Sequence, residues 1–407
     1  MTNKRKLIND PVHGFINIPS ELIHDLIQHP YFQRLRRIKQ LGLSELVYPG
    51  ATHTRFHHAL GAMHLMGLAL TTLMQKGVHI TSEEFEGAQI AILLHDLGHG
   101  AMSHSLEYTL LREVPHEAIS LFLMNKLNQY FDNRLTLAIK IFEDKYPRRF
   151  FHQLVSSQLD MDRMDYLQRD CFFTGVHEGT IGADRIIKML AVVQDELVVE
   201  EKAIYSLENF LTARRLMYWQ VYLHKTNIAA EQMLACVVNR VRYLLQKGKE
   251  VPIYGQFLQM ALMHTITLDA FQDNEVCWQA FTRLDDYDIW ASLKEWANTD
   301  DYLLALLSRG ILDRKLFKVS ISAQKFEPSH LKNIEDDLIK RLNLKHKHLD
   351  YLLMQGTISN EAYWREGESI NVLMKNGQIL DLAQASDLPN IKALRKVVKK
   401  YFVAYLR

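Results

Sequence analysis

Apolar residues recur at intervals of three and four along most of the chain, a spacing typical of helices that pack one face into a core. It predicts helices over residues 54–74, 82–97, 153–170 and 206–246, the last with a break. The start of the helix over 82–97 is the clearest, because Thr81 and Glu84 have the spacing of a capping box. Gly98 supplies a residue that ends helices, so we expect His95 and Asp96 in the last turn.

Shorter segments predict strands. These are the segment GFINI near the start, residues 196–206, residues 316–323, and a hairpin over 369–383 that turns at Asn376 and Gly377. Residues 389–407 predict a basic amphipathic helix. The expected fold class is therefore mainly α with small β-hairpin additions.

Composition narrows the class of protein. The 407 residues are 48% hydrophobic and 23% charged, as in globular proteins. Because 48 Lys and Arg nearly balance 47 Asp and Glu, the net charge of the protein does not attract it to nucleic acid or to an anionic membrane. The three cysteines form no CxxC pair, and no apolar run resembles a signal peptide or a membrane span, so we expect a cytoplasmic protein. A polar stretch near 235–250 suggests two parts, residues 1–235 and 236–407.

The richest chemistry lies in the segment HDLGHGAMSH, residues 95–104. Phosphate loops of the GxxxxGK type, GxSxG elbows and HExxH zinc helices do not occur in the sequence. His95 and Asp96 could instead share an ion with His58 and Asp162 from other predicted helices. Two imidazoles and two carboxylates suit one divalent ion, which could be Mn, Fe, Ni, Zn or Mg. Taken singly, each residue is better explained by a local hydrogen bond or a solvated helix face than by metal binding, and only the four together point to an ion.

Several longer motifs carry a resemblance to a known family. They are INDPVHG (8–14), FQRLRRIKQLG (32–42), YPGATHTRFHHALG (48–61), HDLGHGAMSH and LDMDRMDYLQRDC (159–171). Together they resemble the HD-domain metal-dependent phosphohydrolases, in particular the dNTP triphosphohydrolase branch. That branch includes the bacterial dGTPase-like enzymes and the animal enzymes that join a sterile-alpha-motif domain to an HD domain. We expect no sterile-alpha-motif domain before this match, which is strong to about residue 230 and then fades.

The resemblance implies a helical bundle and an enzyme that cleaves deoxynucleoside triphosphates at the α-phosphorus, releasing deoxynucleoside and triphosphate. The metal ligands would be His58, His95, Asp96 and Asp162, and the catalytic relay would be His99, His104, Glu107 and His116. Phosphate contacts would come from Arg55, Arg163, Tyr166, Arg214 and Lys225, and sugar contacts from Gln40, Asp170 and Tyr222. Gly98 and Gly100 would let the backbone around His99 turn tightly and approach phosphate. Solvated helix faces remain the alternative for the basic residues, and core packing for the tyrosines.

Two departures from the family pattern stand out. Glu107 replaces an Asp of the animal enzymes, which preserves the chemistry on a longer arm. In the nucleotide-sensing site of those enzymes, Lys6, Gln33, Arg36, Arg185 and Lys202 match, but Gln28 and Glu200 replace an acid and an arginine. An amide cannot accept from both guanine N–H groups as a carboxylate does, so we expect weak, altered or absent dGTP activation.

Two other functions stay open. One is an HD phosphodiesterase or nucleotidase that acts on another phosphoester. The other is a non-catalytic protein that binds nucleotides or nucleic acid, with a weak nucleic-acid contact through the basic C-terminal helix. Expected partners are a deoxynucleoside triphosphate substrate and further copies of the chain in a dimer or tetramer, with no membrane.

Overall fold

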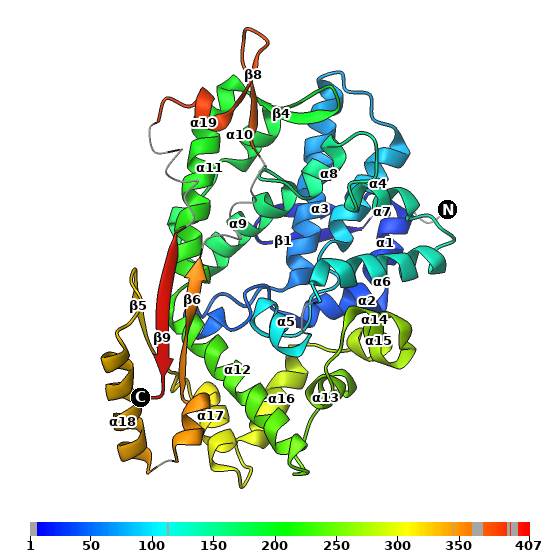
Figure 1. Cartoon of the computed structure of the whole chain (residues 1–407). Coiled ribbons are helices and arrows are strands. Elements are labelled where there is room, and N and C mark those ends of the chain that lie inside the picture. Colours follow the sequence, from blue (N-terminus) through cyan, green and yellow to red (C-terminus); the bar gives the residue numbers. More distant parts are fainter. Residues whose placement is uncertain (1–5, 112–113, 344, 360–368, 389–390, 392–397) are drawn as a thin grey trace.

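Helices dominate the computed structural model of the chain (Figure 1), which describes residues 6–111, 114–343, 345–359, 369–388, 391 and 398–407. Small sheets are added at its periphery, so the expected mainly α HD-domain bundle with β additions is confirmed. None of the helices among these residues is both long and apolar enough to cross a membrane.

Helices α3 (Arg55–Gln75), α4 (Ser82–Leu94) and α9 (Met161–Thr174) pack together around the HD segment. The capping box is confirmed: Glu84 N–H donates to Thr81 Oγ1 over 3.1 Å, and Thr81 N–H donates to Glu84 Oε2 over 2.8 Å. The helix ends at Leu94, three residues before the predicted end, so the prediction that its last turn contains His95 and Asp96 is wrong. His95 and Asp96 therefore lie in the turn that follows α4.

Other helices surround this centre. Their bounds are α1 Glu21–Gln28, α2 Pro30–Gln33, α5 His104–Leu110, α6 His116–Tyr130, α7 Thr136–Phe142, α8 Phe150–Val155, α10 Ala183–Lys188, α11 Ile204–Met217, α12 Lys225–Gln246, α13 Gln256–Met263, α14 Leu268–Asp273, α15 Glu275–Phe281, α16 Asp286–Trp296, α17 Tyr302–Leu312, α18 Pro328–Leu342 and α19 Leu382–Ala385. Single turns of 3-10 helix lie between several of them.

The single helix predicted over 153–170 is wrong, because the chain breaks between α8 and α9. Asp160 explains the break: its carboxylate accepts from Arg163 N over 2.7 Å and from Ser157 N over 2.8 Å, which caps α9. The break predicted within 206–246 is confirmed, since a π-helical segment, Tyr218–Tyr222, separates α11 from α12. The division after residue 235 stays a prediction, and α12 crosses that point without interruption.

The strands form three sheets in the part of the chain that is described. Strands β1 (Leu7–Asp10) and β2 (Gly14–Asn17) make a hairpin. Strands β3 (Leu190–Val193), β4 (Glu196–Glu200), β7 (Asn371–Leu373) and β8 (Ile379–Asp381) lie in that order in a second sheet. The third sheet holds β9 (Lys399–Tyr405) between β5 (Lys318–Ser322) and β6 (Leu353–Ser359). The predicted hairpin is confirmed in β7 and β8, with Gly377 at φ +85° in its turn.

The C-terminal helix predicted over 389–407 is wrong for residues 399–405. They form the central strand β9, hydrogen-bonded to a neighbour on each side. The run of aromatic and β-branched residues from Tyr401 to Tyr405 favours a strand, and pairing on both edges outweighs the helical spacing of the apolar residues. Residues 389–390 and 392–397 of the predicted helix lie outside the described residues.

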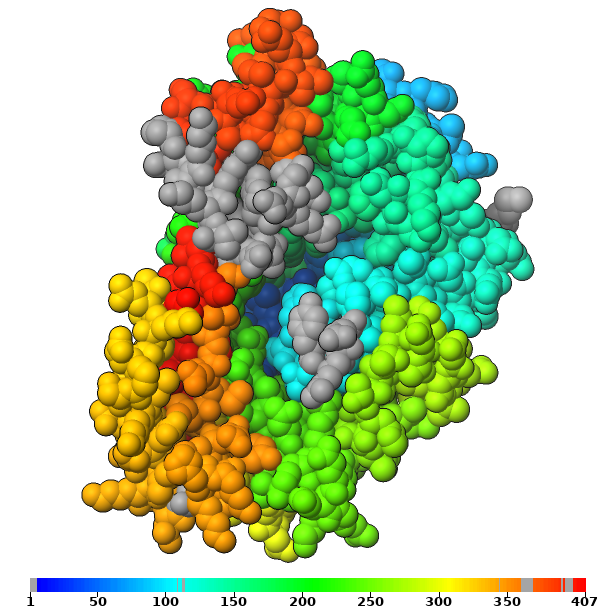
Figure 2. Space-filling view, viewed as in Figure 1, coloured from blue at the N-terminus to red at the C-terminus, as the bar shows by residue number. Residues whose placement is uncertain are grey.

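Figure 2 shows that one face of the molecule is hollowed. The hollow lies between the cyan residues around α5 and the green to red segments of the C-terminal half, and blue N-terminal residues are visible at its bottom. The HD segment and the residues predicted to bind substrate come from these blue, cyan and green parts of the chain.

Candidate metal centre

Helix α3, the turn after α4 and helix α9 bring together His58, His95 and Asp162. Asp162 Oδ1 lies 3.0 Å from His58 Nε2 and 3.5 Å from His95 Nε2. His58 is fully buried, His95 is largely buried, and Asp162 is partly open to solvent. The three ligand atoms form a compact group of a kind that could hold a metal ion. These three residues are far apart in the sequence, and the packing of α3, α4 and α9 brings their side chains close together.

The donors in this group fit a divalent cation. Nitrogen and oxygen ligands about 2.0–2.2 Å from an ion lie about 3–3.5 Å from one another, as these do. The Nε2 atoms of His58 and His95 are buried and neither makes a hydrogen bond, although buried polar atoms are normally paired. His95 Nδ1 donates to the carbonyl of Ile92 over 2.6 Å, which leaves its Nε2 as the electron-pair donor. A cation would satisfy both unpaired nitrogens.

Asp96, the fourth predicted ligand, lies at the edge of the group. Its Oδ1 is 3.2 Å from His95 Nε2 and 3.3 Å from His99 Nε2, and its Oδ2 is 3.8 Å from His58 Nε2. Arg55 Nη1 donates to the same Oδ2. Burial opposes ionisation of Asp96, but Arg55, His95 and His99 outweigh it and hold the pKa of this carboxyl well below its usual range. Asp96 therefore stays anionic beside the two imidazoles.

The histidines are themselves held in an anionic environment. Burial alone would lower the pKa of His58, but the carboxylates of Asp162 and Asp165, one beside each ring nitrogen, raise it to about 10. For Asp162, burial is again the largest opposing influence, and His58 and His95 hold the pKa of the carboxyl well below its usual range. Without an ion, the centre takes up protons to balance its carboxylates, and a divalent cation would replace them.

Helices α5 and α6 meet beside the metal group. Gly98 allows this approach, because a Cβ there would lie 2.5 Å from Ser120 N and 2.9 Å from Ser120 Oγ, and closer still to His116 O. Ser120 Oγ accepts from Gly98 N over 2.8 Å and donates to His95 O over 2.6 Å. The φ of Gly98 and that of Gly100 are not positive, so close packing on α6 explains Gly98, not a left-handed turn.

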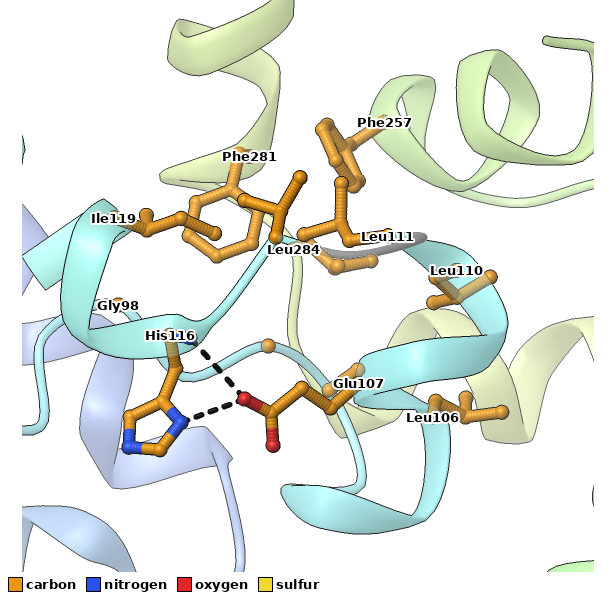
Figure 3. Close-up of a pocket in the computed structure, with 13 residues that line it drawn as sticks. Gly98, Leu106, Glu107, Leu110, Leu111, His116, Ile119, Phe257, Phe281 and Leu284 are labelled. Atoms are coloured by element: carbon orange, nitrogen blue, oxygen red, sulfur yellow. Dashed lines mark hydrogen bonds and ion pairs between the residues drawn. The ribbon is translucent and has the colours of Figure 1, made fainter. Parts of the chain in front are cut away.

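An apolar wall backs this junction (Figure 3). His116 and Glu107 lie at its edge, where Glu107 Oε1 accepts from His116 N over 3.1 Å and from His116 Nδ1 over 2.6 Å. Apolar side chains behind the Glu107 carboxylate lower the local dielectric constant, and this strengthens both hydrogen bonds. The wall consists of Leu106, Leu110, Ile119, Phe257, Phe281 and Leu284.

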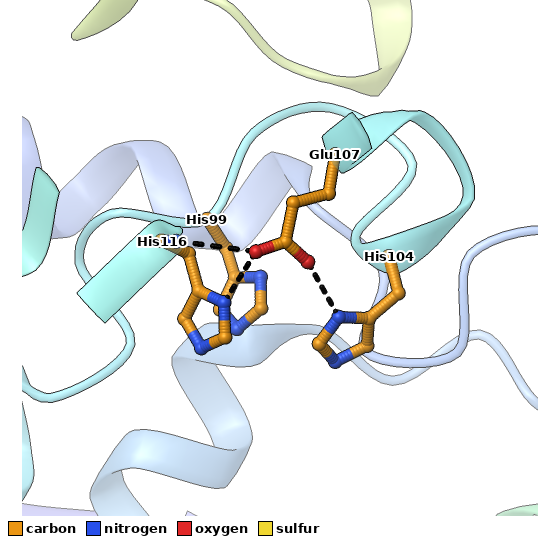
Figure 4. A group of neighbouring side chains, drawn as sticks. All are labelled: His99, His104, Glu107 and His116. Atoms are coloured by element: carbon orange, nitrogen blue, oxygen red, sulfur yellow. Dashed lines mark hydrogen bonds and ion pairs between the residues drawn. The ribbon is translucent and has the colours of Figure 1, made fainter. Parts of the chain in front are cut away.

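The four residues of the predicted relay lie together in the structure (Figure 4). Glu107 is the centre: its Oε2 accepts from His104 Nδ1 over 2.8 Å, while Oε1 binds His116. Burial opposes ionisation of Glu107, but the hydrogen bonds from His104 and His116 hold the pKa of the carboxyl well below its usual range. Burial, with Arg55 and His116, holds the pKa of His99 well below its usual range, so His99 is neutral.

The four relay residues are also of types that bind metal ions, and they lie close together. Their geometry nevertheless favours proton transfer over metal binding. The rings of His99 and His116 stack with centroids 3.7 Å apart and an interplanar angle of 23°. An ion lies in the plane of each imidazole that binds it, and two nearly parallel stacked rings share no such position. By contrast, the rings of His58 and His95 meet at 78°. Both oxygens of Glu107 are already occupied by histidines.

A second buried cluster surrounds Asp170. Tyr222 donates its hydroxyl hydrogen to Asp170 Oδ2 over 2.7 Å, and His53 Nε2 lies 2.8 Å from Asp170 Oδ1. Burial and the nearby Asp170 raise the pKa of Tyr222 well above its usual value, so the phenol stays protonated. Gln40 joins through its backbone, because Gln40 N donates to His53 O, and its side-chain Oε1 is buried without a partner. Tyr222 therefore contacts Asp170 directly, whereas Gln40 is connected to Asp170 through His53.

The cluster also contains a residue that sequence reasoning missed. His53 is fully buried, and its ring stacks on Phe173 with centroids 4.6 Å apart. It lies within the motif YPGATHTRFHHALG, two residues before Arg55, but no spacing rule pairs it with Asp170. The pairing could be inferred only from the packing of two distant segments.

The residues predicted to contact phosphate differ in their positions. Arg55 is buried and bound to Asp96 and to Ser103 Oγ. Arg163 is largely buried, and its Nε donates to Ser157 O over 2.7 Å. Arg214 is buried, with Nη1 donating to Gln158 Oε1 over 2.9 Å, whereas Lys225 is exposed at the start of α12. Tyr166 is half-buried, with its ring 6.3 Å from that of Tyr222. The solvated helix face, the alternative weighed for these cations, describes Lys225 alone.

Comparison with known proteins places the chain among relatives of similar length. Residues 181–250 match a family model described as the HD associated region. A crystal structure described as a phosphohydrolase from Bacteroides thetaiotaomicron VPI-5482 is 50% identical, with a TM-score of 0.95 over 99% of this chain and 100% of that one. The uncharacterized protein YwfO of Bacillus subtilis (strain 168) is 29% identical over 98% of this chain and 92% of its own length.

Several relatives have an activity in their names. The deoxynucleoside triphosphate triphosphohydrolase SAMHD1 homolog of Dictyostelium discoideum is 29% identical over 275 residues. The match covers 63% of this chain and 53% of that protein.

Proposed function

Since this chain belongs to the HD-domain phosphohydrolase family, we propose that it hydrolyses deoxynucleoside triphosphates to deoxynucleoside and triphosphate with one divalent metal ion. The observation that carries the proposal is the unpaired Nε2 atoms of His58 and His95 facing Asp162, beside a separate histidine and carboxylate relay. The similarity to a relative named as a triphosphohydrolase supports the choice of substrate.

His58, His95, Asp162 and Asp96 would hold the ion. When bound, it would act as a Lewis acid that polarises the α-phosphate and lowers the pKa of a water molecule. Arg55 donates a hydrogen bond to Asp96 Oδ2, which keeps that carboxylate anionic and oriented. The cationic charge of Arg55 and Arg163, both held in place by short contacts, offsets part of the charge of a triphosphate.

The relay would supply the proton that the 5′ oxygen takes up when its bond to the α-phosphorus breaks. Glu107 accepts the Nδ1 hydrogen of His104, so when the ring carries a second proton that proton lies on Nε2, from which it can pass to the 5′ oxygen and leave a neutral imidazole. The His104 side chain is 65% exposed, which leaves this nitrogen accessible to a substrate. His116 fixes the other oxygen of Glu107, and neutral His99 separates the relay from Asp96.

The Asp170 cluster would recognise the deoxyribose. A 3′-hydroxyl can donate to Asp170 and accept from the Gln40 amide, whose Oε1 has no other partner. The phenol of Tyr222, fixed on Asp170, would occupy the space that a 2′-hydroxyl needs. Tyr222 belongs to the π-helical segment, and such segments are frequent at functional sites.

The products of hydrolysis test the proposal. Metal-loaded protein is incubated with each dNTP and NTP in ¹⁸O-labelled water, and the phosphate species are identified by ³¹P NMR and mass spectrometry. We expect triphosphate that contains one ¹⁸O atom from each dNTP, deoxynucleoside that contains none, and little product from NTPs. The variants His58→Ala and His104→Gln should lose this activity, the first together with metal binding and the second without it.

Other outcomes would overturn the proposal in defined ways. Orthophosphate or pyrophosphate as the product would indicate a nucleotidase or phosphodiesterase of the same family. Nucleotide binding without any hydrolysis by metal-loaded protein would indicate a non-catalytic role. Cytoplasmic location and assembly into a dimer or tetramer are part of the proposal, and the apparent mass in solution tests the latter.

A further inference from the structure

The face of His58 turned away from the candidate metal site lies against a second carboxylate. Its Nδ1 is 2.7 Å from Asp165 Oδ2, and both side chains are completely buried. Asp165 stands one helical turn after Asp162 on α9, so the same helix offers one carboxylate to each nitrogen of the ring. An ionised carboxylate only accepts hydrogen bonds, so Asp165 holds a His58 hydrogen on Nδ1, and when a metal ion replaces the proton on Nε2 the lone pair lies there.

Asp165 is itself fixed by three more donors. Arg169 Nε donates to Oδ2 over 2.9 Å and Arg169 Nη2 donates to Oδ1 over 2.9 Å. His13 Nε2 lies 2.6 Å from Oδ1. Arg169 then reaches Asp10, with Nη1 donating to Oδ2 over 2.8 Å and Nη2 to Oδ1 over 3.2 Å. Both oxygens of the buried Asp165 carboxylate are therefore held by hydrogen bonds.

Glycine at position 61 makes this arrangement possible. Gly61 lies on α3 one turn after His58, and a Cβ there would overlap Asp165 Oδ1 and Arg169 Nη2 and lie 2.8 Å from the Asp165 carboxyl carbon. The absence of a side chain therefore lets the Asp165 and Arg169 pair of α9 press against the backbone of α3, beside His58.

We propose that Asp165 is a positioning residue for the metal ligand His58, and that Asp10 and His13 of the INDPVHG segment act on His58 through it. The inference rests on the metal site of the proposed function. It assigns a role to the N-terminal hairpin, which supplies no ligand: β1 provides Asp10 and the turn before β2 provides His13. A hydrogen-bonded carboxylate behind a ligating histidine fixes its ring and raises its basicity, and losing such a partner weakens metal binding roughly 10–100-fold.

The test measures binding of Mn²⁺ alone to metal-free protein, with no substrate present. Asp165→Asn leaves one acceptor oxygen for four donors, and we expect its Mn²⁺ affinity to fall roughly 10–100-fold. Asp10→Asn acts one residue further away, through Arg169, and should cause a smaller loss. Glu84→Gln is the matched control, because Glu84 is also a buried carboxylate bound to an arginine, Arg148, but lies away from the site. It should keep the affinity of the parent.

The state of the His58 ring gives a second measurement that needs no folded Asp165 variant. In Zn²⁺-loaded parent protein, ¹⁵N-histidine NMR should show hydrogen on Nδ1 and metal on Nε2 of His58, with the signal assigned by His58→Gln. Hydrogen on Nε2 would overturn the proposal, as would an Asp165→Asn affinity within about twofold of the parent. If His58→Gln leaves Mn²⁺ binding unchanged, the metal site itself is wrong. If Mn²⁺ binds as described but no dNTP is hydrolysed, only the proposed substrate fails.

Discussion

The two glycines that flank His99 are expected to differ sharply in what they tolerate. Gly98→Ala introduces a methyl group 2.5 Å from Ser120 N and 2.9 Å from Ser120 Oγ, against backbone at the start of α6. Gly100→Ala introduces the same group 3.7 Å from Phe281 and 3.9 Å from Leu284, which is ordinary van der Waals contact. Since φ is not positive at either position, only the space around each Cβ distinguishes them.

The size of the loss expected for Gly98→Ala follows from the distance that α6 must move. Ordinary contact begins at 3.4 Å, so α6 must move by about 1 Å at Ser120, and by more at His116, before an alanine fits at position 98. His116 carries the hydrogen bonds that orient Glu107, so the relay moves with it. A misplacement of about 1 Å costs about 100-fold in rate, and overpacking of this kind costs about 1–3 kcal/mol of stability.

The assay is kcat for dNTP hydrolysis in the two variants, with urea unfolding as the stability control. Gly98→Ala should lose about 100-fold in kcat, and Mn²⁺ affinity should fall less, because α6 carries none of the proposed metal ligands. Gly100→Ala should keep its activity, since its methyl group extends the apolar wall. Similar losses in both variants, or full activity in Gly98→Ala, would refute the reasoning.

Three further predictions concern pH and regulation. Since Asp162 and Asp165 outweigh burial and raise the pKa of His58 to about 10, His58 must lose a proton to bind metal, and Mn²⁺ affinity should rise at least about tenfold per pH unit from about pH 6 to 9 in titration calorimetry. A flat profile would contradict this. Burial raises the pKa of Glu231 to about 7, from 4.5. Folded protein therefore binds more protons than unfolded protein between these values, so stability falls as pH rises through this window, and Glu231→Gln should recover up to about 3 kcal/mol at pH 8 but nothing at pH 4.5 in urea unfolding. Equal pH dependence in the variant and the parent would exclude this role. Finally, adding dGTP should not strongly activate hydrolysis of another dNTP, because Gln28 is an amide and Glu200 is paired with Lys76 over 2.6 Å. A steep sigmoidal response would show that another site senses the nucleotide.

Local chemistry made part of this structure predictable. The capping box at Thr81, the turn at Gly377 and the break after α11 depend on residues close in sequence, and the structure contains all three. The C-terminal strand was missed because its identity depends on two partner strands from elsewhere in the chain. The break before α9 was missed because apolar spacing continues through Asp160, whose capping role needs its side-chain geometry.

The candidate site divides in the same way. Residue types and the resemblance pointed to the groups around His95 and Glu107, and the structure brings each group together. The partners of those residues were not predictable: Arg55 binds Asp96, His53 binds Asp170, and Asp165 binds His58. Each pair joins segments that are far apart in sequence, so only the packing of the helices defines it.

The most direct test of the account is a crystal of this protein soaked in Mn²⁺ and measured for anomalous scattering. One strong peak should lie within about 2.3 Å of the Nε2 atoms of both His58 and His95, with oxygens of Asp162 and Asp96 completing the protein ligands. A peak among His99, His104, Glu107 and His116, or no peak between His58 and Asp162, would contradict the central claim.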